Sequence, residues 1–191
     1  GTLLYASQLL SYSKERKAPV LVDESFLPFT SEASLNPHAD GNLFILHSLT
    51  KFWALPGLRI GALVGDIQQL ASGRPPWSVN VMAEAAALAS IADSTHAAQT
   101  RKFIAEESAW LATELALLPG FHVSVPTANY LYVQSTQASA IVHFAATRRI
   151  LIRDCSKWPG LSQPSFRAAV RLRPENEKLL ATLKEFICAS S

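Results

Sequence analysis

A lysine and an arginine eight residues apart, with hydroxyl side chains beside them, are the residues of this chain best suited to chemistry. Lys51 lies just after Ser48 and Thr50, and Arg59 follows a Pro-Gly turn. Lys51 has apolar neighbours, and desolvation lowers the pKa of a lysine toward the neutral amine that forms a Schiff base with a carbonyl. Hydroxyls and a guanidinium suit a phosphate. On spacing alone a solvated loop lysine is the ordinary interpretation, and the hypothesis set against it is a covalent lysine beside a bound phosphate.

Short apolar runs must position these residues. Residues 20–22, 43–46 and 60–64 are continuous apolar segments, which is typical of buried strands. Asp23 follows the first run and Ser48 lies just after the second. Open α/β sheets bind ligands at the carboxyl ends of their strands. We therefore expect an α/β fold with Asp23 and the lysine segment at one sheet edge.

The pattern changes in the second half of the chain. Ser78 is the expected cap of a helix through Ile91, Asp93-Ser94 interrupts it, and a long helix then runs to about Leu118. Beyond it, strands are predicted at 122–125, 129–134, 150–152 and 166–172, and helices at 139–149 and 175–187. This mixture predicts a small α+β domain. We expect residues 1–94 to belong to a large domain and residues 95–191 to hold the linking helix and the small domain.

Composition excludes several classes of function. The chain has 191 residues, 49% of them hydrophobic and 17% charged, with a formal charge of +2, which disfavours disorder and nucleic-acid binding. No apolar run approaches the length of a membrane span. The five histidines show no metal-ligand spacing, and two cysteines form no disulfide framework. We expect a cytoplasmic protein with no metal, membrane or nucleic-acid partner.

The segment of residues 47–61 resembles a known cofactor motif. Ser-Leu-Thr-Lys followed by Pro-Gly-Leu-Arg-Ile-Gly is similar to the pyridoxal 5'-phosphate lysine motif of the fold-type I aminotransferase superfamily. The resemblance implies an aspartate-aminotransferase-like large domain. It also implies that Lys51 is the catalytic lysine and that Ser48, Thr50 and Arg59 hold the cofactor phosphate.

A second segment resembles the same superfamily. Val22-Asp23-Glu24-Ser25-Phe26 is similar to its Asp-Glu-Ala-Tyr/Phe motif, which implies that Asp23 pairs with the pyridinium nitrogen of the cofactor. Members with Tyr in place of Phe26 use its phenol to bond the ring oxygen. This chain must obtain that bond elsewhere or lack it.

Two arginines of the second region complete the predicted site. On local sequence Arg153 and Arg167 suit a carboxylate and a phosphate, or are ordinary surface arginines. Residues 150–171 and Pro-Pro-Trp-Ser-Val-Asn at 75–80 resemble the threonine-phosphate decarboxylases, the branch nearest to histidinol-phosphate aminotransferases. That resemblance implies that Arg167 binds mainly the substrate carboxylate and Arg153 mainly its phosphate. Arg171 and Arg173 are interpreted as solvated or structural.

The resemblance covers the chain but only the C-terminal portion of the family. Gly1-Thr2 is similar to the end of the family's Asn-Pro-Thr-Gly motif, so we expect a longer protein that forms a homodimer. The implied reaction is decarboxylation of L-threonine O-3-phosphate to aminopropanol phosphate in cobalamin biosynthesis. The alternatives are a class I/II aminotransferase acting on histidinol phosphate and a truncated, non-catalytic binding or scaffold relative.

Overall fold

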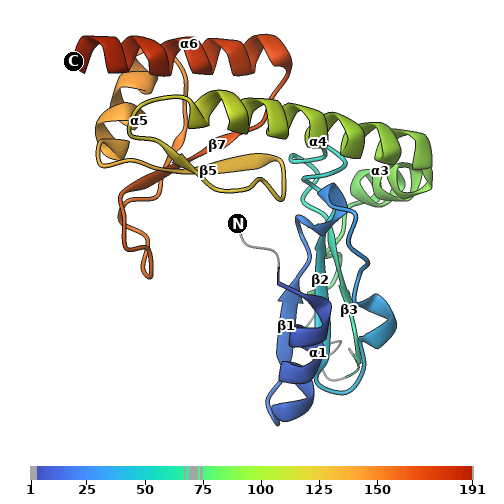
Figure 1. The fold of residues 1–191 in the computed structure, drawn as a ribbon. Coiled ribbons are helices and arrows are strands. Elements are labelled where there is room, and N and C mark those ends of the chain that lie inside the picture. The colour runs from blue at the N-terminus through green and yellow to red at the C-terminus, as the bar shows by residue number, and fades with distance from the viewer. Residues whose placement is uncertain (1–3, 67, 69–72, 74, 191) are drawn as a thin grey trace. The chain divides into compact units, whose positions relative to one another are not determined.

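The computed structural model describes residues 4–66, 68, 73 and 75–190 and contains two compact units. The N-terminal unit comprises residues 2–101 and the C-terminal unit residues 102–191. They meet inside the long helix α4, Ser94–Ala116 (Figure 1). The sequence predicted a boundary at residues 94 and 95, at the start of this helix, and that domain division stays a prediction. None of the described helices is long and apolar enough to cross a lipid bilayer.

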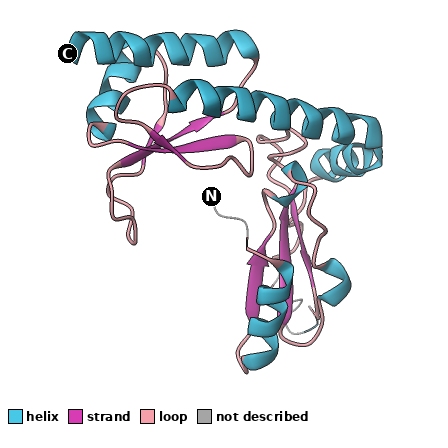
Figure 2. Ribbon diagram, viewed as in Figure 1, coloured by secondary structure: helices cyan, strands magenta, loops and turns pink. Residues whose placement is uncertain are grey.

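The N-terminal unit is built on a three-stranded sheet in the order β1-β2-β3 (Figure 2). Strand β1 spans Val20–Asp23, β2 Leu43–Ser48 and β3 Gly61–Val64. Strands β1 and β2 are parallel, and β2 and β3 are antiparallel. These are the three strands predicted from the apolar runs.

Helix α1, Ala6–Glu15, packs on one face of this sheet. Its Leu9 and Leu10 contact a core formed by Leu35, Leu43 and Ile45. Residues on the other face are more accessible, because side chains alternate along a strand, and Leu21 is 59% exposed. Parallel sheets normally bury both faces, so this sheet is part of a larger layer.

Two short 3-10 turns connect β1 to β2: η1, Leu27–Phe29, and η2, Asn36–His38. Helix α3 spans Val81–Ala92. The prediction that Ser78 caps it is wrong: the Asn80 side chain accepts the hydrogen bond from the Ala83 N–H at 2.8 Å. An asparagine is at least as good a cap as a serine, and Asn80 lies directly before the first helical residue.

The C-terminal unit contains an antiparallel sheet in the order β4-β5-β7-β6. The strands are β4 His122–Val123, β5 Tyr130–Gln134, β6 Arg153–Asp154 and β7 Ser165–Ala169. Helix α5, Ala138–Thr147, lies between β5 and β6 in the chain, and α6, Arg173–Ser190, closes it. The alternation predicted for this region is therefore correct in outline.

The strand predicted at residues 150–152 is misplaced. Arg149 adopts a left-handed backbone with φ 62°, and the Ile150 N–H donates back to the Ala145 carbonyl. This hydrogen bond and the one from Arg149 N–H to the Ala146 carbonyl form a Schellman motif that ends α5. Because Ile150 belongs to the helix cap and Leu151 is 88% exposed, the strand begins only at Arg153.

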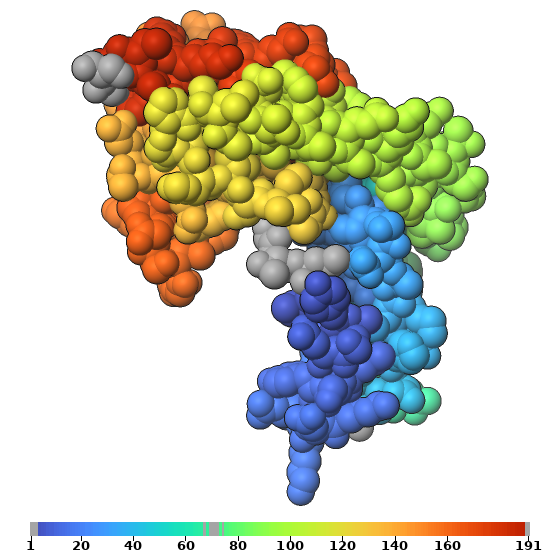
Figure 3. Space-filling model, viewed as in Figure 1, coloured from blue at the N-terminus to red at the C-terminus, as the bar shows by residue number. Residues whose placement is uncertain are grey.

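Helices α4 and α6 are joined by a charged clamp. The Arg173 guanidinium donates to both Glu107 oxygens at 2.8–3.1 Å, and the Asn176 amide donates to the same carboxylate at 3.0 Å. Side chains of α6, in red, lie against those of the C-terminal part of α4, in yellow-green (Figure 3). The hydrogen bonds from Arg173 hold the pKa of Glu107 below its ordinary value. The interpretation of Arg173 as structural is confirmed.

Candidate active site

Three predicted site residues are connected by hydrogen bonds just after β2. The Lys51 Nζ donates to the Ser48 Oγ at 2.9 Å, and the Ser48 Oγ lies 2.8 Å from the Thr50 Oγ1. Ser48 is the last residue of β2, so the strand end fixes one member of this cluster. An amine and two hydroxyls are thereby brought together at the sheet edge.

The loop that carries Lys51 has a constrained backbone. Leu49 N–H donates to the Ile60 carbonyl, which holds the two ends of the loop together. Ala54 and Arg59 adopt left-handed conformations with φ 52° and 53°, which are uncommon for residues other than glycine. Such residues persist only where the surrounding structure imposes them, and they cluster at functional sites.

Gly61 is required where this loop enters β3. It pairs with Ser48, and a Cβ placed on it would lie 2.6 Å from the His47 carbonyl oxygen. A side chain at this position would push β3 away from β2. The glycine therefore keeps the Arg59 end of the loop next to Ser48.

The Arg59 guanidinium makes few hydrogen bonds within the described residues. It makes one hydrogen bond, to the Pro56 carbonyl at 3.4 Å. A guanidinium carries five N–H donors, so most of its capacity is available to an anion. Together with Ser48, Thr50 and Lys51, this donor set fits a phosphorylated carbonyl cofactor.

The desolvation of Lys51 that its apolar neighbours suggested is not found in this structure. Lys51 is exposed, whereas Phe52 is only 2% exposed. The centre of the Phe52 ring lies 5.1 Å from that of Phe29 and 4.9 Å from that of Trp53. The aromatic neighbours of Lys51 therefore pack against one another, and the lysine side chain lies outside that cluster. The Lys51 Nζ instead lies 5.3 Å from the centre of the Phe26 ring, at cation-π distance.

Asp23 lies at the same edge of the sheet as Ser48. It pairs with Leu46 across the parallel strands, two positions before Ser48 on β2. One oxygen, Oδ1, accepts the Ser25 N–H at 2.8 Å, and no bond to Oδ2 is found in the described part of the chain. The carboxylate therefore has one oxygen fixed and one available to a cationic ring nitrogen.

Glu24 and His47 form a buried network that sequence reasoning missed. The Glu24 carboxylate accepts hydrogen bonds from Ser34 Oγ at 2.7 Å and Leu35 N–H at 2.8 Å, and the His47 Nε2 lies 3.8 Å away. His47 also bonds the Asn36 Oδ1 at 2.7 Å. Asp23 and Glu24 are thus neighbours in sequence with different partners. The Glu24 carboxylate holds the loop that contains Ser34 and Leu35 through hydrogen bonds.

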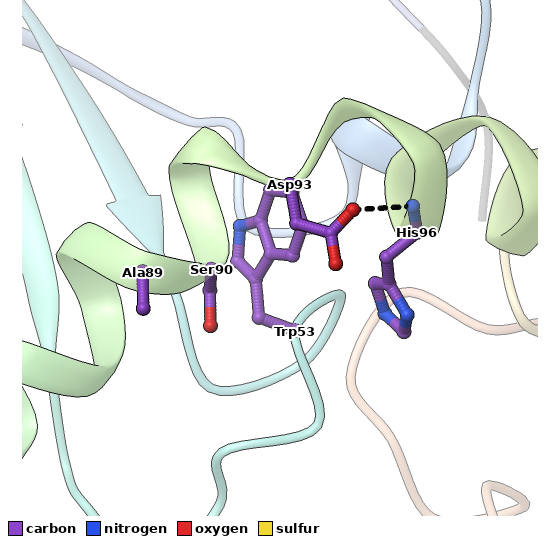
Figure 4. Close-up of a pocket in the computed structure, with 5 residues that line it drawn as sticks. All are labelled: Trp53, Ala89, Ser90, Asp93 and His96. Carbon is purple, nitrogen blue, oxygen red and sulfur yellow. Dashed lines mark hydrogen bonds between the residues drawn. The ribbon is translucent and has the colours of Figure 1, made fainter.

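A shallow hollow of about 260 Å³ lies near Trp53 but is a separate feature. It is lined by Trp53, Ala89, Ser90, Asp93 and His96. The Trp53 indole and the His96 imidazole stack with their ring centres 5.8 Å apart, and the Asp93 carboxylate accepts the backbone N–H of His96 at 2.9 Å. Figure 4 shows the five lining residues and this hydrogen bond. The lining contains a carboxylate and neither Lys51 nor Arg59, so this hollow does not suit the cofactor phosphate.

Arg153 and Arg167 face each other in the C-terminal unit. They are directly paired between β6 and β7, and Tyr132 of β5 pairs with Arg167 on its other side. Two like charges placed opposite each other repel, which an anion between them would relieve. In the described part of the chain, neither arginine bonds a carboxylate, and the buried Tyr132 hydroxyl has no hydrogen-bond partner. The pairing thus brings two arginine side chains next to each other on neighbouring strands.

Comparisons with known proteins connect these features. The sequence pattern of the family "Aminotransferase class I and II" matches residues 1–183. Threonine-phosphate decarboxylase of Salmonella typhimurium is 35% identical over 176 residues, 88% of this chain and 48% of that protein. Histidinol-phosphate aminotransferase of Chlorobaculum tepidum is 31% identical over 173 residues, 88% of this chain and 49% of that protein.

A solved structure has the same fold. The histidinol-phosphate aminotransferase of Sinorhizobium meliloti, in complex with pyridoxal-5'-phosphate, superposes with a TM-score of 0.89 at 20% identity. The match covers 100% of this chain and 55% of that one. The predicted α/β fold is confirmed as part of a larger domain, and the chain spans about half the length of the curated relatives it matches.

Proposed function

Since this chain belongs to the family of class I and II aminotransferases, we propose that it forms the lysine-bearing part of an enzyme that decarboxylates L-threonine O-3-phosphate. The product would be (R)-1-amino-2-propanol O-2-phosphate, an intermediate of cobalamin biosynthesis. The observation that carries the proposal is the hydrogen-bonded Lys51, Ser48 and Thr50 cluster at the strand end beside Asp23.

The family's cofactor is pyridoxal 5'-phosphate, so the cofactor predicted from residues 47–61 is confirmed at the level of the family. When bound, this group supplies an electron-withdrawing ring that stabilises negative charge at the substrate α-carbon. The local chemistry fits it: Lys51 is an amine for its aldehyde, and Ser48, Thr50 and Arg59 are donors for its phosphate. These assignments are part of our proposal.

Lys51 and Asp23 have distinct roles in this proposal. Lys51 would hold the cofactor through its Nζ, and the same nitrogen would supply the proton that the substrate carbon takes up when carbon dioxide leaves. Asp23, whose Oδ2 is available, would pair with the ring nitrogen of the cofactor and keep that nitrogen protonated. Ser48 orients the Lys51 Nζ through their 2.9 Å hydrogen bond.

Arg167 and Arg153 bind the substrate in this proposal. Arg167 takes mainly the carboxylate and Arg153 mainly the phosphate, since a guanidinium binds either anion through two parallel hydrogen bonds. Their direct pairing between β6 and β7 keeps the two anion sites adjacent, as a small phosphorylated amino acid requires. The way in which these arginines orient the substrate carboxylate would then decide whether carbon dioxide is the leaving group.

Transamination is the second candidate, because the Chlorobaculum tepidum relative is named for that reaction on histidinol phosphate. The residues proposed above would serve either reaction. The test is to give the whole protein threonine phosphate and, separately, histidinol phosphate with 2-oxoglutarate. We expect carbon dioxide from the first mixture. Glutamate from the second without carbon dioxide from the first would refute the decarboxylase.

A non-catalytic binding or scaffold role is the alternative from another class. It predicts that purified protein mixed with pyridoxal 5'-phosphate develops no visible absorption band of a covalently held cofactor. Our proposal predicts such a band, and its loss in Lys51→Ala. A colourless wild-type protein would favour the scaffold.

The proposal extends to assembly and location. We propose a homodimer in the cytoplasm that acts on a small phosphorylated amino acid. Cys155 and Cys188 are both free thiols, which a reducing compartment would preserve. Sedimentation of the whole protein tests the dimer, and a monomer that retains full activity would contradict it.

A further inference from the structure

We propose that Trp158 is a positioning residue that holds Arg167 ready for the substrate anion, an inference that rests on the function proposed above. Trp158 lies in the turn between β6 and β7 and is 47% exposed. It is outside both strands that carry the predicted arginines. Its ring is nevertheless a neighbour of the Arg167 guanidinium.

The Arg167 guanidinium lies near two aromatic rings, those of Tyr130 and Trp158. The Cζ atom lies 4.7 Å from the centre of the Tyr130 ring and 6.0 Å from that of Trp158. Rings attract a guanidinium to their faces and leave its N–H edge available for hydrogen bonds. A carboxylate would occupy that edge, and none bonds Arg167 in the described residues. The contacts thus restrict the side chain without using its donors.

Repulsion from Arg153 makes this restriction necessary. Arg153 is the direct cross-strand partner of Arg167, and like charges in such pairs are destabilising. An arginine side chain with several rotatable bonds would otherwise turn away from its partner. Tyr130, diagonal to Arg167 across the β5–β7 pair, and Trp158, on the connecting turn, oppose that movement.

The turn that carries Trp158 is fixed at its base. The Trp158 N–H donates to the Cys155 carbonyl at 3.0 Å, and the Cys155 N–H donates to Ser165 of β7 at 2.9 Å. Cys155 is fully buried. The Asp154 carboxylate accepts the Ser156 N–H and the Ser139 hydroxyl, both at 2.8 Å, which lowers the pKa of Asp154. These hydrogen bonds fix the backbone of the turn from which the Trp158 ring projects.

A second tryptophan provides a matched control. The centre of the Trp110 ring lies 3.8 Å from the Arg173 Cζ, which is closer than the 6.0 Å between the centre of the Trp158 ring and the Arg167 Cζ. Arg173 is already bound to the Glu107 carboxylate and has no part in the proposed site. Loss of the Trp110 ring therefore tests what removal of a tryptophan from an arginine does to stability alone.

The experiment compares Trp158→Ala, Trp158→Phe and Trp110→Ala in the whole protein. Binding of O-phosphothreonine is measured by calorimetry, and KM, kcat and melting temperature are measured in parallel. We expect Trp158→Ala to raise Kd and KM about fivefold with kcat changed less than about twofold. Trp158→Phe restores most of the binding because it keeps a ring, and Trp110→Ala lowers the melting temperature with Kd unchanged.

The outcomes separate this inference from the proposed function. Unchanged Kd in Trp158→Ala, or equal losses in Trp158→Ala and Trp158→Phe, overturns the role of Trp158 whatever the enzyme's reaction. Binding of O-phosphothreonine without its turnover overturns the decarboxylase and leaves the comparison of Kd values to decide on Trp158. A wild-type protein that does not bind O-phosphothreonine overturns both.

Discussion

Arg173 and Arg167 both lie against a tryptophan in the C-terminal unit, but their surroundings assign them different tasks. Arg173 donates to both oxygens of the buried Glu107, and that carboxylate also accepts the Asn176 amide. Arg167 has aromatic neighbours and no carboxylate partner among the described residues. An arginine whose donors are used inside the fold stabilises it, whereas one that is held by rings and keeps its donors can serve a ligand.

The same distinction applies to the other predicted site cations. Lys51 bonds a hydroxyl, Arg59 one carbonyl, and Arg153 faces another arginine. By contrast, Arg148 pairs with Glu185 and Arg171 with Glu175. Cations without an acidic partner are thus found in both units where the sequence predicts phosphate and carboxylate binding.

The largest effect on kcat/KM is expected for substitution of Arg167, with the same substitution of Arg173 as the comparison. Arg167→Gln should lower kcat/KM for threonine phosphate about 100-fold, because a hydrogen bond between charged groups is lost. Arg173→Gln should leave kcat/KM nearly unchanged and lower the free energy of unfolding. Steady-state kinetics and urea unfolding of both variants check this. A large loss of kcat/KM in folded Arg173→Gln, or no loss in Arg167→Gln, would contradict the different roles assigned to the two arginines.

Glu107→Gln should be the next largest change. It removes the carboxylate that serves Arg173 and Asn176, and leaves buried donors with a weaker acceptor. We expect the free energy of unfolding to fall by about 1–3 kcal/mol. Asn176→Ala removes one bond to the same carboxylate and two bonds to the Arg171 backbone, so it should also lower the free energy of unfolding. Urea unfolding of Glu107→Gln that matches wild type would contradict a structural clamp.

The clamp also has a pH dependence. The hydrogen bonds from Arg173 lower the pKa of Glu107 in the folded protein. The stabilising contribution of the Glu107 carboxylate is therefore fully present above the ordinary glutamate pKa of about 4.3. That contribution is lost as the pH falls through the lowered, folded-state pKa. The stability difference between wild type and Glu107→Gln should therefore shrink on acidification. A difference that grows toward acid pH would reverse the sign and refute this account.

Arg171→Ala should have the smallest effect. Arg171 pairs with Glu175 four residues later, and both side chains are largely exposed. Exposed pairs of this kind contribute about 0–1 kcal/mol, so the free energy of unfolding should fall by less than about 0.5 kcal/mol. Chemical unfolding at low and moderate salt measures it. A loss as large as that of Glu107→Gln would mean that burial of the carboxylate partner does not distinguish the two ion pairs.

Local patterns were sufficient to predict much of the fold. The apolar runs at 20–22, 43–46 and 60–64 formed strands, as their short length and β-branched and aromatic residues predict. The break at Asp93-Ser94 separates α3 from α4 as expected. The strand at Arg153 was displaced in the prediction, since apolar residues 150–152 resemble a strand until the left-handed Arg149 is known.

The site depends more on tertiary contacts than on local patterns. The spacing of Ser48, Lys51 and Arg59 identified the family, yet the exposure of Lys51 follows from Phe52 turning into the core, which spacing does not determine. The network of Glu24 and His47 with the segment at residues 34–36 joins groups 10 or more positions apart in sequence, which local patterns do not reveal. Trp158 lies in the segment that resembles the family, but its relation to Arg167 was not predicted, because it depends on the register of β6 and β7.

The most direct test of the account is to find the lysine that holds the cofactor. The whole protein is loaded with pyridoxal 5'-phosphate, reduced with borohydride to fix the covalent bond, and digested for peptide mass spectrometry. We predict one modified peptide, carrying the adduct on Lys51, its absence in Lys51→Ala, and its retention in the control Lys102→Ala. An adduct on another lysine, or one that survives in Lys51→Ala, would contradict the central role of Lys51.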